Sequence, residues 1–200
     1  MGVAITAPTR GRPRDPRRRD AILHAAISLV AEVGYDRTTV EAIAQRAGVS
    51  KPTIYRRWPR GKEEILVEAI RAKRAAAGEL PDTGSLRGDL LVLLEAVVVS
   101  LDARIAGGLL SQLPSSPELT ALLRDEVVAD ERNRYAVLLE RAAARGEVTT
   151  PVTPLFADIA GSVIFTRSLI AGEPLDRPFL EELVDRVLLP ITKEPNADSR

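Results

Sequence analysis

The sequence contains no cysteine and only one histidine, His24. A chain without thiols can form neither disulfides nor thiolate metal sites. One imidazole is too few for a histidine-based zinc site or a Ser-His-Asp triad, and no pair of carboxylates stands out as an acid–base site. We therefore expect no metal, no cofactor and no catalytic residues. His24 falls opposite Ile22 and Ala25 on a helical projection, so we expect it to be exposed.

Long apolar runs and aromatic residues are scarce as well. The longest apolar run, residues 90–99, is interrupted by Glu95, whereas a membrane-spanning helix needs about 18 apolar residues. The N-terminus has no apolar stretch suited to a secretion signal, so we expect a cytoplasmic protein with no membrane partner. Aromatic residues form 4% of the chain and hydrophobic residues 45%. Since no strand pattern is present either, the predicted fold class is all-α.

The net charge is zero, but the two signs of charge are separated along the chain. Residues 1–62 contain 13 Lys and Arg against 5 Asp and Glu, whereas residues 63–200 contain 15 against 23. A basic N-terminal third joined to an acidic remainder is typical of a chain in which one part binds a polyanion and the other does not.

One predicted helix precedes residues 38–58 and another follows them. Asp15-Pro16 supplies an N-cap followed by proline at the first helical position, and Gly34 ends this helix. A second amphipathic helix covers about residues 62–77.

Residues 38–58, between these helices, have the pattern of a helix-turn-helix unit. Thr38-x-x-Glu41 matches a capping box that begins a helix, and Gly48 ends it. Ser50 is then a suitable N-cap for a short further helix. In such a unit the second helix enters the DNA major groove while the first supports it across the backbone.

The remainder of the chain predicts four more helices, over about residues 86–106, 116–145, 154–171 and 177–190. The last two have apolar faces wider than one core contact requires. Small residues on the first of these two, Ala157, Ala160, Gly161 and Ser162, suit either a dimer seam or ordinary packing within one chain.

The residues from Thr38 to Pro59, TTVEAIAQRAGVSKPTIYRRWP, resemble the TetR family of bacterial repressors, and the resemblance extends over about residues 17–77. It implies about nine helices, with a DNA-binding domain over 15–77 and a regulatory and dimerisation domain over 78–200. It also implies a homodimer formed by the last two helices. A small-molecule effector that binds among the central helices would move the two DNA-binding units apart.

The resemblance assigns roles to residues of the helix-turn-helix unit. Thr39 and Tyr55 would contact phosphate, and Arg57 and Lys62 would lie near the DNA backbone. Base edges or the groove wall would be contacted by Lys51, Pro52, Thr53 and Arg56. The complete candidate set there is Thr38, Thr39, Ser50, Lys51, Pro52, Thr53, Tyr55, Arg56, Arg57 and Lys62. The turn at 59–62 is one residue longer than the family's usual form, so Arg60 could share the role of Lys62.

Residues 1–14 read as a disordered basic arm. Arg10, Arg12 and Arg14 form an Arg-Gly-Arg-Pro-Arg segment that suits a narrow A·T-rich minor groove. A disordered tail that adds only general attraction for DNA explains the same residues equally well.

The predicted function is a ligand-responsive transcriptional regulator, most simply a repressor, which binds a near-palindromic operator in double-stranded DNA as a homodimer. A DNA-binding protein without a ligand is the main alternative. An enzyme is the third, and no nucleophile–base pair or phosphate loop supports it. No effector-binding residue is predicted. Glu95, Arg132, Arg134 and Tyr135 suit a ligand. A solvent-facing helix surface explains Glu95 better, however, and explains the two arginines equally well.

Overall fold

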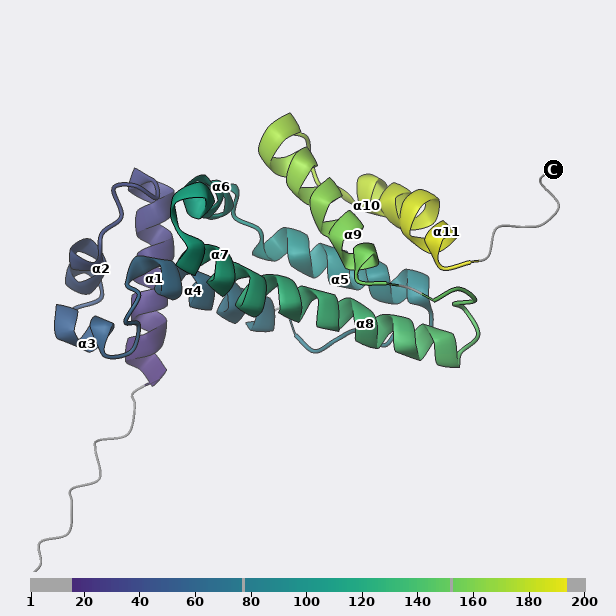
Figure 1. The fold of residues 1–200 in the computed structure, drawn as a ribbon, viewed down its shortest axis with the longest axis horizontal. Helices are drawn as coiled ribbons and strands as arrows, with labels where there is room; N and C mark the ends of the chain where they lie inside the picture. Colours follow the sequence, from purple (N-terminus) through teal and green to yellow (C-terminus); the bar gives the residue numbers. More distant parts are fainter. Residues whose placement is uncertain (1–15, 77, 152, 194–200) are drawn as a thin grey trace, which may run out of the picture.

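The computed structural model describes residues 16–76, 78–151 and 153–193. Throughout these ranges the regular structure is helical, so the predicted all-α class is confirmed. Six helices are followed by three that contain π-helical turns, so the described residues form nine helices. Figure 1 shows their arrangement. The first six are α1 (Pro16–Val33), α2 (Val40–Arg46), α3 (Lys51–Tyr55), α4 (Lys62–Ala76), α5 (Leu86–Ser100) and α6 (Ala103–Gln112).

Each of the last three helices contains one π-helical turn. After a 3-10 turn at Leu113–Ser115, α7 (Pro117–Leu123) passes through a π turn at Arg124–Val128 into α8 (Ala129–Ala144). Helix α9 (Leu155–Phe165) ends in a π turn at Thr166–Ala171. The last helix comprises α10 (Arg177–Leu183), a π turn at Val184–Leu188 and α11 (Leu189–Ile191).

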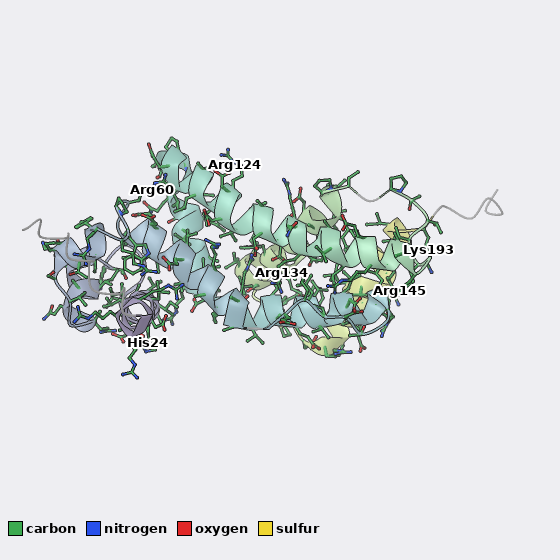
Figure 2. The ribbon with its side chains drawn as sticks, turned by 90° about the horizontal axis from the view of Figure 1, so that it is seen from below. His24, Arg60, Arg124, Arg134, Arg145 and Lys193 are labelled. Carbon is green, nitrogen blue, oxygen red and sulfur yellow. The ribbon has the colours of Figure 1, made fainter. Side chains whose placement is uncertain are left out.

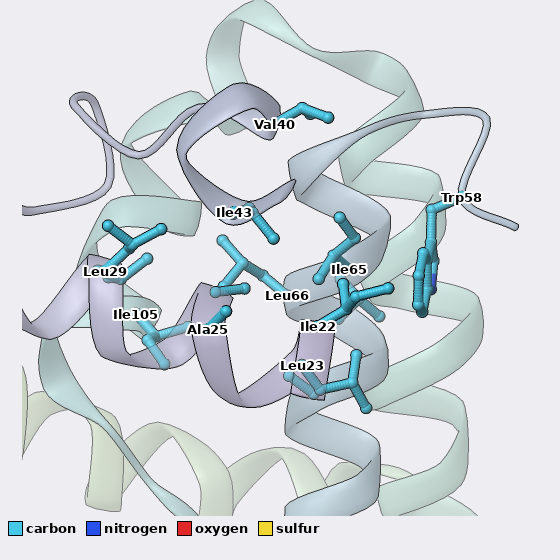
Figure 3. Close-up of a cluster of buried hydrophobic side chains, with 14 of the residues drawn as sticks. Ile22, Leu23, Ala25, Leu29, Val40, Ile43, Trp58, Ile65, Leu66 and Ile105 are labelled. Atoms are coloured by element: carbon cyan, nitrogen blue, oxygen red, sulfur yellow. The ribbon is translucent and has the colours of Figure 1, made fainter. Parts of the chain in front are cut away.

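Helices α1 to α4 surround a first hydrophobic core (Figure 3). Ile22, Ile43, Ile54, Trp58 and Ile65 are all at most 2% exposed there, so each of the helices contributes an apolar side chain. The same core also takes in residues of α6 and α7. Helices α1 to α4 therefore do not have a core of their own, because α6 and α7 complete it.

Local signals explain the turns around α2. Thr39 is its N-cap, with an extended backbone and a hydroxyl that accepts a 3.1 Å hydrogen bond from the Ala42 amide. The prediction that Thr38 caps this helix is therefore wrong by one residue. Gly48 adopts a φ of 65° in the turn after α2, a left-handed conformation that suits glycine.

The predicted single helix over 86–106 is also wrong, because the chain breaks at residues 101–102. Leu101 has an extended backbone with ψ of 124°. Asp102 begins α6 as its N-cap, and its carboxylate accepts from the amides of Arg104 and Ile105. Leu86–Ser100 and Ala103–Gln112 are thus separate helices that run in different directions (Figure 1).

Helix α6 packs closely against α1 and the turn that follows it. A Cβ atom on Gly108 would lie 2.3 Å from the Tyr35 Cβ, so only glycine fits at this contact. Arg104 Nη1 also donates to the carbonyl of Ala31 on α1.

A second core joins α5, α8, α9 and the last helix, and Figure 1 shows these elements at the end of the molecule away from α1–α3. Tyr135 and Phe156 meet edge to face within it, with ring centroids 5.8 Å apart. Ala157 and Ala160 are buried in this core. Their small size therefore serves packing within the chain.

Ion pairs join α5 to the last helix along its solvent side. Arg87 donates twice to Asp185, at 2.7 and 2.8 Å, and Glu95 accepts from Arg177 at 2.5 Å. The interpretation of Glu95 as part of a solvent-facing surface is confirmed. Among the described helices, none is long and apolar enough to cross a membrane.

Candidate nucleic-acid interface

Helix α3 has one buried residue and a polar outer surface. Ile54 is fully buried and anchors the helix to the first core. Lys51, Pro52, Tyr55 and Arg56 are exposed. The exposed side chains of one short helix thus include two cations and an aromatic hydroxyl, a set that can contact both phosphates and base edges.

Lys51 is held in place by an acidic neighbour on α2. Its Nζ donates to Glu41 Oε1 at 2.6 Å, and both side chains are exposed. The hydrogen bond to Glu41 raises the pKa of Lys51, so its positive charge is retained. Sequence reasoning identified Lys51 but assigned Glu41 only to a helix cap.

Two hydroxyl groups lie beside these cations. The Ser50 and Thr53 hydroxyl oxygens are 2.9 Å apart. Ser50 is the N-cap of α3 as predicted, although its side chain forms no capping hydrogen bond. Thr39 is exposed at the start of α2. These groups remain accessible to a DNA backbone.

Thr38 departs from the predicted set because it is fully buried. Its hydroxyl donates to the Gly34 carbonyl at 2.8 Å, across the turn between α1 and α2. Its role in this conformation is to fix that turn, so we remove it from the candidate DNA contacts.

Arg57 faces back toward the protein more than its neighbour Arg56. Its guanidinium lies 5.1 Å from the ring centroid of Trp58, and its Nη2 is 3.5 Å from Glu68 Oε1. Since its side chain is still 37% exposed, a phosphate near this edge of the helix can still be reached.

Lys62, which we predicted to lie near the DNA backbone, instead contacts Tyr35 of the protein. Its Nζ lies 4.0 Å from the ring centroid of Tyr35 and donates to the Tyr35 carbonyl at 3.1 Å. Arg60, two residues earlier, is exposed. Figure 2 shows Arg60 at the same end of the molecule as His24, which is exposed as predicted, and far from Arg145 and Lys193.

The basic arm residues Arg10, Arg12 and Arg14 lie outside the described residues. Their role stays a prediction. Within the described chain, no group of three or more His, Cys, Asp or Glu side chains is arranged to hold a metal ion.

A cavity of about 690 Å³ lies between α1 and α4 on one side and helices of the second core on the other. Its wall is mostly apolar and comes from α1, α4, α5, α6, the α7–α8 helix and α9, for example Ile70, Leu109, Val127 and Phe165. Ligand pockets in proteins have volumes of about 300–1,000 Å³ and walls of this kind. No sequence pattern indicated these residues, because they come from six separate helices.

Four of the candidate ligand residues can now be placed. Arg132 lines the cavity and donates twice to Asp158, at 2.9 and 2.7 Å. Tyr135 is buried in the second core and Arg134 is half-buried beside it. Glu95 is engaged with Arg177 outside the cavity.

Two family profiles match the chain. The profile of bacterial regulatory proteins of the tetR family matches residues 22–69, which contain the whole helix-turn-helix unit. The profile of the tetracyclin repressor-like C-terminal domain matches residues 80–187. The chain belongs to the TetR family.

Individual TetR-family proteins are similar over most of their length. An uncharacterized HTH-type transcriptional regulator of Mycobacterium bovis is 34% identical over 186 residues, which are 92% of this chain and 91% of that protein. The DNA-binding transcriptional repressor TetR of Mycobacteroides abscessus is 33% identical over 181 residues, covering 88% and 94% of the two chains.

Solved structures show the same architecture. The crystal structure of one TetR family transcription regulator has a TM-score of 0.71 and 28% identity, and the match covers 90% of this chain and all of that one. A putative TetR-family regulator from Rhodococcus sp. shares the fold with a TM-score of 0.68 at 22% identity, over 87% of this chain and all of that one. As a TetR-family member, this chain is a DNA-binding transcriptional regulator and not an enzyme. Regulators of this family typically bind DNA as dimers.

Proposed function

We propose that this TetR-family protein is a repressor that binds a near-palindromic operator as a homodimer and is released by a small-molecule effector. In this proposal residues 15–77 form the DNA-binding domain and residues 78–200 the regulatory and dimerisation domain. Because a repressor of this kind binds chromosomal DNA, we propose that the protein is located in the cytoplasm.

The observation that carries the proposal is the outer surface of α3. Ile54 fixes the helix to the core while Lys51, Pro52, Tyr55 and Arg56 are exposed together. We assign base contacts to Lys51, Pro52, Thr53 and Arg56. Backbone contacts would come from Thr39, Ser50, Tyr55, Arg57 and Lys62, with Arg60 sharing the role of the enclosed Lys62.

Dimerisation would use the last two helices, residues 154–171 and 177–190. They carry large apolar side chains that the protomer leaves exposed, including Ile170 at 82% and Val187 at 37%. A second copy of the chain is the partner we propose, because it brings a second α3 to the other half of a palindrome. One recognition helix alone contacts too few base pairs for tight specificity.

The apolar cavity supports control by a small molecule. It is lined by α4, which directly follows the helix-turn-helix unit, and by helices of the second core. A molecule that binds better to the conformation without DNA would shift the protein away from its operator.

Fluorescence anisotropy with the DNA that flanks the protein's own gene, against a scrambled fragment, tests DNA recognition. We expect a preference of about 10³ or more for the native fragment. Arg56→Ala should weaken binding to that fragment by roughly 5–150-fold, the loss of about 1–3 kcal/mol given for a base contact. Lys193→Ala, an exposed basic residue beyond the proposed dimer helices and far from Arg60 (Figure 2), is the matched control and should leave binding unchanged.

Equal binding to both fragments, with log affinity falling in proportion to log salt, would reduce the interaction to phosphate attraction. The architectural alternative without a ligand would then replace the repressor.

A further inference from the structure

Three carboxylates line the cavity, and two of them accept hydrogen bonds from groups of the protein. Asp102 caps α6 by accepting from the amides of Arg104 and Ile105. Asp158 accepts two hydrogen bonds from Arg132. Glu131 on α8 is different, since its Oε2 is buried and accepts no hydrogen bond in the described structure.

In the described structure one cation, Arg74, lies within ion-pair distance of Glu131, but it donates no hydrogen bond to the carboxylate. Arg74 Nη1 lies 3.1 Å from Glu131 Oε2, with both side chains only 15% exposed. The same nitrogen donates to the Val127 carbonyl at 3.3 Å. The pair is thus close in space, but the geometry is not that of a hydrogen bond.

Burial makes this arrangement costly. Loss of water raises the pKa of Glu131, although the nearby charges of Arg74 and Arg134 partly oppose the effect. A buried carboxylate oxygen without a donor is less stable than one that accepts a hydrogen bond. A ligand that supplies a donor at this position recovers that stability.

We propose that the cavity binds a predominantly apolar molecule with one protonated amine, whose ammonium group donates to Glu131 Oε2 and replaces Arg74 as its counter-ion. This inference rests on the proposed effector role of the cavity and names the chemical class of the effector.

An anionic ligand fits the cavity less well. Arg132 and Arg124 have carboxylate partners, Asp158 and Asp125. Lys73 lines the cavity but is exposed, so water already solvates its ammonium group. The group with most to gain from a ligand is therefore the buried anion.

Replacement of Arg74 by the ammonium group would also affect the DNA-binding unit, because Arg74 lies on α4. Arg74 and Arg71 on α4 form ion pairs with Glu131 and Glu126 on the α7–α8 helix. Glu68, six residues before Arg74 on the same helix, binds the indole of Trp58 just after α3. Displacing Arg74 weakens the attachment of α4 to the cavity wall, about 9 Å along the helix from the Trp58 contact.

Calorimetry with decylamine, decanol and decanoate tests the proposal, since the three probes share a tail and differ in the head group. We expect the full-length protein to bind decylamine at least tenfold more tightly than either of the others. Glu131→Gln should abolish this preference. Asp102→Asn, which replaces another cavity carboxylate with an equally good N-cap residue, should keep it. Arg74→Gln frees Glu131 from its competitor and should tighten decylamine binding.

Equal binding of the three probes, binding of none, or a preference for decanoate would overturn the proposal. An amine preference that survives Glu131→Gln in a variant with an unchanged circular dichroism spectrum would do so as well. The operator titration separates this failure from that of the function. If the wild type prefers decylamine but keeps its DNA, the site chemistry stands and ligand-controlled release fails. If operator binding is specific but no amine preference appears, only the effector class is wrong.

Discussion

Trp58 donates its indole N–H to Glu68 Oε2 at 2.5 Å, and Arg19 donates to Oε1 of the same carboxylate at 2.5 Å. One side chain of α4 thereby joins α1 to the segment that follows α3. Because Trp58 is only 1% exposed, its N–H has no access to water that would replace Glu68.

Glu68→Ala should lower the free energy of unfolding by about 1–3 kcal/mol, because it leaves the buried Trp58 donor without a partner. Urea denaturation followed by far-ultraviolet circular dichroism measures the change. Glu140→Ala, an exposed position on α8, is the control and should alter the free energy by no more than about 0.5 kcal/mol. Equal losses in the two variants would contradict the role of the Glu68 contacts.

The same carboxylate predicts a dependence of stability on pH. Burial opposes the ionisation of Glu68, but hydrogen bonds from Arg19 and Trp58 outweigh it and lower its pKa below the usual value of 4.5. A group whose pKa is lower in the folded protein stabilises the fold above its unfolded pKa and loses this effect as the pH falls. We expect the free energy of unfolding to decrease below about pH 4.5, and Glu68→Gln to make that decrease shallower. Identical slopes for the two proteins would rule out this contribution.

Neighbouring glycines of α6 give a sharp test of how the two parts of the chain are joined. Gly108→Ala would place a methyl group against Tyr35 and should destabilise the protein by about 1–3 kcal/mol through overpacking. Gly107→Ala is the matched control, since no atom lies within 4 Å of its added Cβ. Alanine at that exposed helical position should stabilise the protein by about 0.5–1 kcal/mol. Thermal unfolding of both variants should therefore shift in opposite directions, and a shift of the same sign would contradict the contact.

The proposed dimer is tested at its most exposed apolar residue. Ile170→Asp places a charge on the face formed by the last two helices and should convert the protein to a monomer in light scattering. Val33→Asp, at an exposed apolar position on α1, should leave the mass unchanged. A dimeric Ile170→Asp protein would show that the subunits meet elsewhere.

The helix-turn-helix unit could be predicted because its signals are local. Gly48 and Ser50 mark the turn and the start of α3 within a few residues of each other. The error at Thr38 arose because two adjacent threonines could both cap a helix. The packing of Gly34 and Tyr35 decides between them, and that packing is a property of the fold.

The missed break at residues 101–102 had a signal in the sequence. Asp102 is a strong N-cap residue, and Ser100 bonds back to the Val97 carbonyl at 2.9 Å. The mostly apolar run at residues 90–99, just before them, concealed both. The cavity had no such signal, because Arg74, Glu131 and Asp158 meet only after α4, α8 and α9 have packed.

The position of Trp58 has a consequence for spectroscopy. It is the only tryptophan in the chain, and its indole is buried against the Glu68 carboxylate three residues after α3. An indole in such surroundings emits at shorter wavelength than one in water, and its emission responds to the loss of a neighbouring charge. The protein therefore carries an intrinsic fluorophore at the junction of α3 and α4, which reports on the DNA-binding unit without any attached dye.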